Sequence, residues 1–241
     1  MAWQTPKTNW TGADGVRNTD LNRIEGNILE LYNGVARADR TFYVTPTGDD
    51  TTGDGTAAAP YKTIMKAIES IPTDFARKSI GLNIAAGTYD EDVILRGFDG
   101  VIKWYSAGVV NVRSLLVEGC CVNQYGTQTN FKRGITLDFG ASYTGQSLMY
   151  VSESTYSGIV VRNGSRFVLY NTATISNTTS AAIEVSGSSM LYISTVAGTN
   201  NSIGIRADTG SVAGYGVMNI TANTQRISNT GGRIYTGSSL T

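Results

Sequence analysis

The stretch VVRNGSRFVLYNTATISNTTSAAIEVSG, residues 160–187, spans one period of an internal repeat. A run rich in β-branched residues ends at Gly164, a second run and a polar segment follow, and the next run ends at Gly187. Similar runs end in a glycine about every 23 residues, at Gly97, Gly119, Gly140, Gly164, Gly187, Gly210 and Gly232. A repeat of this length, with two or three short strands and Gly, Asn and Ser at the corners, fits one coil of a parallel β-helix. We therefore predict an all-β rod of about seven coils, on the order of 35 Å long.

An amphipathic segment before the first coil is predicted to cap this rod. In PYKTIMKAIESIP, residues 60–72, apolar residues recur three and four positions apart, which gives a helix over 61–71 one apolar face. Pro60 suits the start of the helix and Pro72 its end. The first coil of a β-helix exposes strand edges and apolar core, so we expect the helix to cover it. The apolar positions are Tyr61, Ile64, Met65, Ile68 and Ile71.

The loop before this helix partly matches a calcium-binding loop. Asp50, Thr52, Asp54 and Gly55 fall at positions one, three, five and six, but position twelve is Tyr61, where a glutamate is needed. We therefore interpret the aspartates as turn-forming residues, and we predict neither a metal site nor a cofactor.

A second helix is predicted near the N-terminus, with Thr19 or Asp20 as its N-cap. A helix of about four turns is marginal alone, so its apolar stripe is expected to lie on the rod, on a partner helix from another copy, or on a docking protein. Trp3 and Trp10 add apolar surface that a free tail does not need. We interpret residues 1–40 as an attachment arm and residues 41–241 as the capped β-helix. The stripe consists of Leu21, Ile24, Ile28, Leu31 and Val35.

Composition excludes several classes of function. The chain has 19 basic and 19 acidic residues and no histidine, which argues against nucleic-acid binding and removes histidine-based catalysis. No apolar run approaches the roughly 20 residues of a membrane span, and the N-terminus shows no secretory signal, so we predict no membrane partner. The adjacent Cys120 and Cys121 would point to opposite faces of a strand, one thiol in the core and one outside.

Because the chain has no histidine, any catalysis would have to use carboxylates, Lys, Arg or Tyr. Asp138 and Arg162 each lie two residues before a turn glycine, so they should stack as neighbours on the rod. We interpret them as a surface ion pair and not as half of a glycosidase site, and we predict that the chain is not an enzyme. The acidic residues of the coils are sparse: Glu118, Asp138, Glu153, Glu184 and Asp208.

Aromatic residues cluster in the middle coils. Their rings could stack on sugar rings, or they could be buried in a subunit interface or in the core. The possible glycan contacts are Trp104, Tyr105, Tyr125, Tyr143, Tyr150 and Tyr156.

Two segments carry a resemblance to known families. WQTPKTNWTGADGVRNTDLNRIEGNI, residues 3–28, resembles the opening of tail or baseplate structural proteins from phages and prophages of Gram-positive bacteria. The segments FYVTPTGDDTTGDGTAAAPYKTIMKAIESIP (42–72) and IAAGTYDEDVIL (84–95) are similar to the beginning of pectin-lyase-like right-handed β-helices, a form frequent in phage tailspikes and fibres. Together the matches cover about the first 95 residues, and the later coils match only in period.

This resemblance implies a right-handed β-helix in a virion component that is assembled in the host cytoplasm. It also implies a homotrimer, whose arm would contact other tail, baseplate or head proteins and whose rod could contact a host-surface glycan. We expect a nonenzymatic spike or fibre that serves host attachment or particle structure. A polysaccharide-degrading tailspike, and a head fibre or capsid decoration protein, remain alternatives, because this fold is shared by enzymes and inert spikes.

Overall fold

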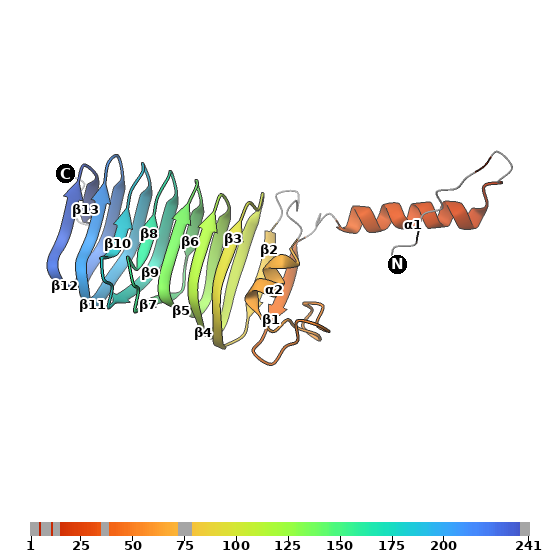
Figure 1. Ribbon diagram of the computed structural model, residues 1–241, viewed down its shortest axis with the longest axis horizontal. Helices are drawn as coiled ribbons and strands as arrows, with labels where there is room; N and C mark the ends of the chain where they lie inside the picture. Colours follow the sequence, from red (N-terminus) through yellow and green to blue (C-terminus); the bar gives the residue numbers. More distant parts are fainter. Residues whose placement is uncertain (1–4, 6–10, 12–14, 35–38, 72–78, 237–241) are drawn as a thin grey trace.

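The computed structural model describes residue 5, residue 11 and residues 15–34, 39–71 and 79–236. It shows a right-handed parallel β-helix of about seven coils, as predicted (Figure 1). The helices are α1 (Asn18–Gly34) and α2 (Ile64–Glu69). The strands are β1 (Arg40–Val44), β2 (Ser79–Ile84), β3 (Gly87–Arg96), β4 (Val101–Glu118), β5 (Cys121–Asp138), β6 (Ser142–Gly145), β7 (Leu148–Ser152), β8 (Ile159–Val161), β9 (Arg166–Ser176), β10 (Ala181–Val185), β11 (Met190–Asp208), β12 (Val212–Thr230) and β13 (Arg233–Thr236).

Each coil contributes to three faces, and its strands pair in parallel with the coils on either side. In β5 the first face is formed by residues 121–126, the second by 128–131 and the third by 134–138. The first face also contains β1, β2, β6 and β13, the second contains β7, and the third contains β8 and β10. Long strands such as β4 and β11 bend around the corners and contribute to all three faces.

The turn glycines lie at the corner between the third and the first face. Gly97, Gly119, Gly140, Gly164, Gly187 and Gly210 have φ between 59° and 75°, which is the left-handed region that glycine adopts without a steric penalty. The last corner differs from the prediction, because Gly231 and not Gly232 has the positive φ, at 98°. At Gly232 the backbone instead lies so close to the preceding coil that a Cβ would be 2.7 Å from the carbonyl carbon of Ala207.

The core consists of side chains that stack in rows along the rod. On the first face Ile102, Val122, Tyr143 and Phe167 occupy consecutive positions of one row, and all are buried. The rings of Tyr143 and Phe167 stack 4.9 Å apart with an interplanar angle of 1°. Residues alternate between inside and outside along each strand, so the outward positions remain free to carry function.

The capping helix is confirmed, but it is shorter than predicted. It begins at Ile64 with Thr63 as the N-cap, and it lies against β1 and β3 at the N-terminal end of the rod (Figure 1). The carboxylate of Glu91 in β3 accepts hydrogen bonds from the backbone N–H groups of Ile64 and Met65, at 3.0 and 2.9 Å. The first turn of the helix is therefore capped by the first coil, which sets its start after Thr63 and not at Pro60.

The aspartates of the preceding loop form turns, as predicted. Asp49 accepts hydrogen bonds from the N–H groups of Thr51 and Thr52, and Asp54 accepts one from Thr56. Asp50 reaches further and accepts from the N–H groups of Lys62 and Thr63 and from the Thr63 hydroxyl.

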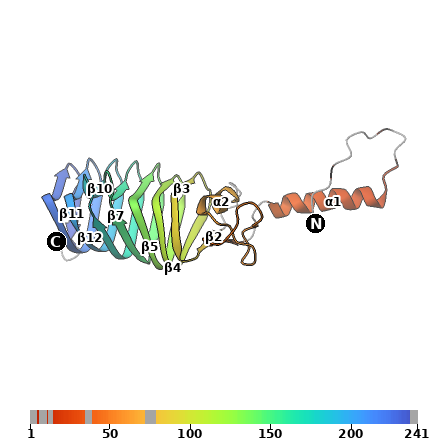
Figure 2. The same ribbon diagram turned by 60° about the horizontal axis from the view of Figure 1, so that its bottom comes forward.

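The helix of the arm is also present. It begins at Asn18, and Asp20 lies inside its first turn, where its carboxylate accepts a hydrogen bond from the N–H of Arg17. Both views show α1 extending away from the end of the rod and not lying along its side (Figures 1 and 2). The described side chains of the apolar stripe are correspondingly exposed, with 48% for Leu21, 43% for Ile24 and 59% for Ile28.

Candidate functional site: a polar groove on the second face

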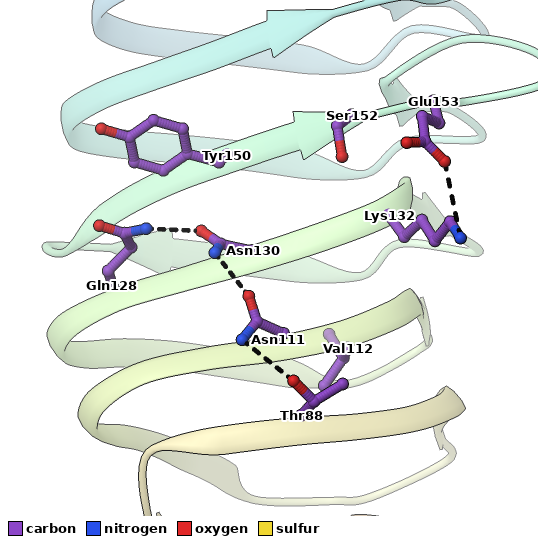
Figure 3. A pocket seen from close by; sticks show the side chains of 9 residues that line it. All are labelled: Thr88, Asn111, Val112, Gln128, Asn130, Lys132, Tyr150, Ser152 and Glu153. Atoms are coloured by element: carbon purple, nitrogen blue, oxygen red, sulfur yellow. Dashed lines mark hydrogen bonds and ion pairs between the residues drawn. The ribbon is translucent and has the colours of Figure 1, made fainter.

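An open groove of about 570 Å³ crosses the second face in the N-terminal half of the rod (Figure 3). Four successive coils line it, through residues of β3, β4, β5 and β7, together with the turn after β7. A ligand that occupied the whole groove would therefore extend along the rod axis. The lining residues are Thr88, Asn111, Val112, Gln128, Asn130, Lys132, Tyr150, Ser152 and Glu153.

A ladder of side-chain amides runs along the floor of the groove. Gln128 donates a 2.7 Å hydrogen bond to Oδ1 of Asn130, and Asn130 donates one of 2.7 Å to Oδ1 of Asn111. Asn111 in turn donates to Gly87 O at 3.3 Å and to the Thr88 hydroxyl at 3.4 Å. Because an amide carries two N–H donors and two acceptor lone pairs, the ladder holds each amide in place and leaves hydrogen-bonding positions for a ligand.

Tyr150 stands beside this ladder. It occupies the position after Asn130 in the same outward row, and 38% of the residue is exposed. Figure 3 shows its ring next to Gln128 and Asn130, on the opposite side of the groove from Lys132 and Glu153. An exposed aromatic ring beside fixed amides can contact both the apolar and the hydroxyl-bearing parts of a sugar.

The other side of the groove carries an ion pair. Nζ of Lys132 lies 3.6 Å from a carboxylate oxygen of Glu153, and both side chains are 63% exposed. Glu153 has a φ of 62° in the turn that follows β7. The groove thus combines neutral amides, one tyrosine and an exposed charge pair that bridges two coils.

The acidic residues considered for catalysis lie largely elsewhere and are paired with arginines. On the third face Glu118 pairs with Arg96, and Glu184 pairs with Arg206 at 2.5 Å. The predicted ion pair between Asp138 and Arg162 is confirmed, with a distance of 2.7 Å. Asp208 lies near Arg206 as well, at 3.9 Å.

The environment of Asp138 is unsuited to a general acid. Burial acts to raise its pKa, but hydrogen bonds from Asn163, Arg162 and the backbone N–H of Phe139 outweigh burial and hold the pKa below its ordinary value of 3.8. A glycosidase needs a carboxyl group whose pKa is raised so that it stays protonated. Asp138 therefore acts as an anchor for the turn that contains Phe139.

Two of the possible glycan contacts lie in the core, which was the other location considered for these aromatic residues. Trp104 and Tyr143 are only 1% exposed, because they occupy inward positions of the first face. There they belong to a buried chain of hydrogen bonds. Trp104 Nε1 donates to the Ser106 hydroxyl, which bonds the Thr129 hydroxyl; Gln124 donates to Thr129 and accepts from the Tyr143 hydroxyl.

The remaining possible glycan contacts are outside the core but do not form one aromatic surface. Tyr105 and Tyr125 occupy the first face and stack on each other with ring centroids 5.2 Å apart. The ring faces in this stack are covered and cannot contact a sugar. Tyr156 is 59% exposed in the turn between β7 and β8 and does not line the groove. Only Tyr150 of the predicted set lies in the groove.

The arm residues are described only in part. Trp3, Trp10 and Val35 lie outside the described residues, as does the side chain of Leu31. The predicted difference between the cysteines is confirmed, since Cys120 is buried and Cys121 exposed. Burial raises the pKa of the Cys120 thiol to about 11, which makes it unreactive at neutral pH.

Sequence reasoning missed the amide ladder. Its signal was present, because Thr88 and Asn111 are 23 residues apart and Asn111 and Asn130 are 19 apart, close to one period of the repeat. Polar residues that recur at that period on outward positions form a row along the rod.

Comparison with protein-family models, with curated proteins and with solved structures finds no match. Within the described ranges, no group of three or more His, Cys, Asp or Glu side chains is placed to hold a metal ion. Neither described helix has the length and apolar character that crossing a membrane requires.

Proposed function

We propose that this chain is a nonenzymatic component of a phage particle, a tail or baseplate spike or fibre, that binds a host-surface glycan in the groove of its second face. The observation that carries the proposal is the ladder of Gln128, Asn130 and Asn111 beside the exposed ring of Tyr150. Hydrogen bonds within the ladder hold the amides in place before a ligand arrives, which lowers the entropy lost on binding.

The arm supports the attachment part of the proposal. The exposed residues Leu21, Ile24 and Ile28 lie on one stripe of a helix that extends from the N-terminal end of the rod. Exposed apolar residues at heptad spacing suit association with further helices. We assign this stripe to a homotrimer that docks on other virion proteins, which also follows the resemblance of residues 3–28 to tail and baseplate proteins.

The paired carboxylates favour binding over cleavage. Glu118, Asp138 and Glu184 each pair with an arginine. For Asp138, hydrogen bonds from Asn163 and Arg162 outweigh burial and lower the pKa, which disfavours the protonated state of a general acid. A polysaccharide-degrading tailspike would need such an acid beside its substrate.

The test is binding of the full chain to a panel of bacterial surface polysaccharides, with Asn130→Ala/Tyr150→Ala as the groove variant and Thr174→Ala as the control. Thr174 follows Tyr150 in the same outward row and does not line the groove. We expect the groove variant to lose binding and the control to retain it. Equal binding by both variants would contradict the groove as the site.

The same samples distinguish the alternative functions. Release of new reducing ends or unsaturated sugars by the wild-type chain, lost in Asp138→Asn, would establish the degrading tailspike instead. An image of the virion with this chain labelled separates a tail or baseplate spike from a head fibre or capsid decoration.

A further inference from the structure

Two carboxylates from different parts of the chain hold the first turn of the capping helix. Asp50, in the loop before α2, accepts hydrogen bonds from the N–H groups of Lys62 and Thr63 at 2.8 and 3.0 Å. The Thr63 hydroxyl donates a further one to Asp50, at 2.8 Å. Glu91 of β3 accepts hydrogen bonds from the next two N–H groups of the chain, at 3.0 and 2.9 Å. Four consecutive backbone donors therefore depend on two ionisable acceptors.

The loop and α2 together close the N-terminal end of the rod, and we name residues 45–71 the end cap. The N–H of Tyr43 in β1 donates to Gly55 O at 2.9 Å, and the N–H of Tyr61 donates to Tyr43 O at 3.0 Å. The loop thus covers the outer edge of β1, while α2 lies against β1 and β3. The side chains that α2 buries there are Ile64, Ala67 and Ile68.

The end cap is attached less extensively than a coil inside the rod. The strand β5, for example, pairs with β4 on one side and with β6, β7 and β8 on the other. The end cap, within the described chain, contacts the rod on one side only. Because the stability of a stacked-repeat protein is close to a sum of contacts between neighbours, its end can open while the coils behind it stay folded.

Acid removes the charge that holds the end cap in place. Burial acts to raise the pKa of Asp50, but hydrogen bonds from Thr63 and Lys62 outweigh it and hold the pKa below its ordinary value of 3.8. The contribution of Asp50 is therefore fully present above 3.8 and is lost as pH falls through the lowered value. The charged and titratable groups around the two carboxylates are Lys62 and Lys66 beside Asp50, Asp49, Asp54 and Arg40 along the loop, and Tyr89, Asp90, Asp92 and Arg113 on the side of Glu91.

The other aspartates of the loop act in the same direction. Backbone hydrogen bonds from Thr51 and Thr56 lower the pKa values of Asp49 and Asp54, which fix turns of the loop. These turns also lose their charged acceptors in acid. On the β3 side, Arg113 is paired with the carboxylates of Asp90 and Asp92, so Glu91 is left to hold α2.

We propose that the end cap is an acid-sensitive latch, which opens when Asp50 and Glu91 are protonated while the coils behind it stay folded. Opening exposes the edge of β1 and the apolar side of the first coil. Both views place α2 and β1 at the end of the rod that faces α1 (Figures 1 and 2). The latch therefore lies at the joint between the arm and the rod, and acid changes that joint. This inference does not depend on glycan binding in the groove.

The experiment measures amide hydrogen exchange of the full chain, peptide by peptide, from neutral pH to below 3.8, corrected for the intrinsic pH dependence of exchange. Residues 61–71 report on the end cap, and residues 159–185 report on the coils. The variants Asp50→Asn and Glu91→Gln, alone and combined, mimic the protonated carboxylates at neutral pH. Asp90→Asn is the matched control, because the side chain of Asp90 is 87% exposed and pairs with Arg113.

In the wild type, protection of residues 61–71 should fall in acid by about tenfold for each carboxylate that becomes protonated, while residues 159–185 keep their protection. Each single variant should lose about tenfold at neutral pH, and the double variant about a hundredfold. Further acidification should change the double variant little. Asp90→Asn should follow the wild type at every pH.

Three results would overturn the inference. Loss of protection at the same pH in residues 61–71 and 159–185 would show that acid unfolds the whole rod. Wild-type protection of residues 61–71 in both single variants at neutral pH would show that the two carboxylates do not hold the end cap. An equal loss in Asp90→Asn would assign the effect to net charge and not to the hydrogen bonds. If the double variant fails to fold, the single variants decide between these outcomes.

Discussion

The Asp138 carboxylate accepts a 2.7 Å hydrogen bond from Nε of Arg162, one coil further along the rod. The same carboxylate accepts hydrogen bonds of 2.8 Å from the backbone N–H of Phe139 and 2.7 Å from the side chain of Asn163. Phe139 has a φ of 53°, which is costly for an aromatic residue. Asp138 thus stabilises a strained corner and joins it to the next coil.

Asp138→Asn should lower the free energy of unfolding by about 1–3 kcal/mol at neutral pH, because a neutral amide replaces the buried carboxylate that accepts hydrogen bonds from Arg162, Asn163 and the Phe139 N–H. The pKa of Asp138 is lower in the folded than in the unfolded chain, so this contribution is fully present above the ordinary pKa of 3.8 and is lost as pH falls through the lowered value. Denaturant unfolding of wild type and variant at a series of pH values measures the difference. A difference that stays constant into strong acid would contradict this account.

Tyr143→Phe should destabilise the rod by about 1–3 kcal/mol, since it leaves the buried side-chain oxygen of Gln124 without its hydroxyl donor. Tyr170→Phe is the matched control, because Tyr170 is 61% exposed and its hydroxyl can bond water. Thermal and denaturant unfolding of the two variants should separate them clearly. Equal stability of both variants would show that Gln124 finds another donor in the core.

Glu91→Gln should weaken the cap of the rod, because it removes a charged acceptor from the first turn of α2. We expect a loss of about 1–2 kcal/mol in the free energy of unfolding and more aggregation during heating, as the first coil becomes exposed. Glu69→Gln, an exposed position of the same helix, is the control. Unfolding curves with light scattering check both effects, and identical behaviour of the two variants would refute the capping role.

Ile24→Asp/Ile28→Asp should convert the proposed trimer into single chains, because charges on the exposed stripe oppose helix association. Asn22→Asp, an exposed position outside the stripe, adds charge as a control and should leave the trimer intact. Light scattering should give three times 25.7 kDa for wild type and control, and 25.7 kDa for the double variant. A wild-type mass of 25.7 kDa at every dilution would disprove the trimer.

Removal of residues 1–40 should leave a folded rod, because α2 and its partners Glu91 and Asp50 remain. The shortened chain should be absent from virions, since the proposed docking surface has been deleted. Circular dichroism and immunoblots of purified particles test the two halves of this prediction. Particles that still contain the shortened chain would assign docking to the rod.

The sequence by itself determined the length of each coil, the number of coils and the existence of both helices. Coil length is a local property, because a turn glycine such as Gly164 or Gly187 ends each strand of the third face. The alternation of side chains along the strands between these turns then sets which residues point inward. The stacked pair of Asp138 and Arg162 followed from the same period, because residues one coil apart become neighbours.

The tertiary structure alone decided which side chains gather into a site. Corners between faces vary in length, and irregular register at the corners of β4 and β5 shifts residues between inward and outward positions. Trp104 and Tyr143, by contrast, lie in the core at regular inward positions of the first face, although their residue type equally suits a surface that binds sugars. The amide ladder likewise depends on pairing across coils, which brings Asn111 and Asn130 within 2.7 Å only after the rod has formed.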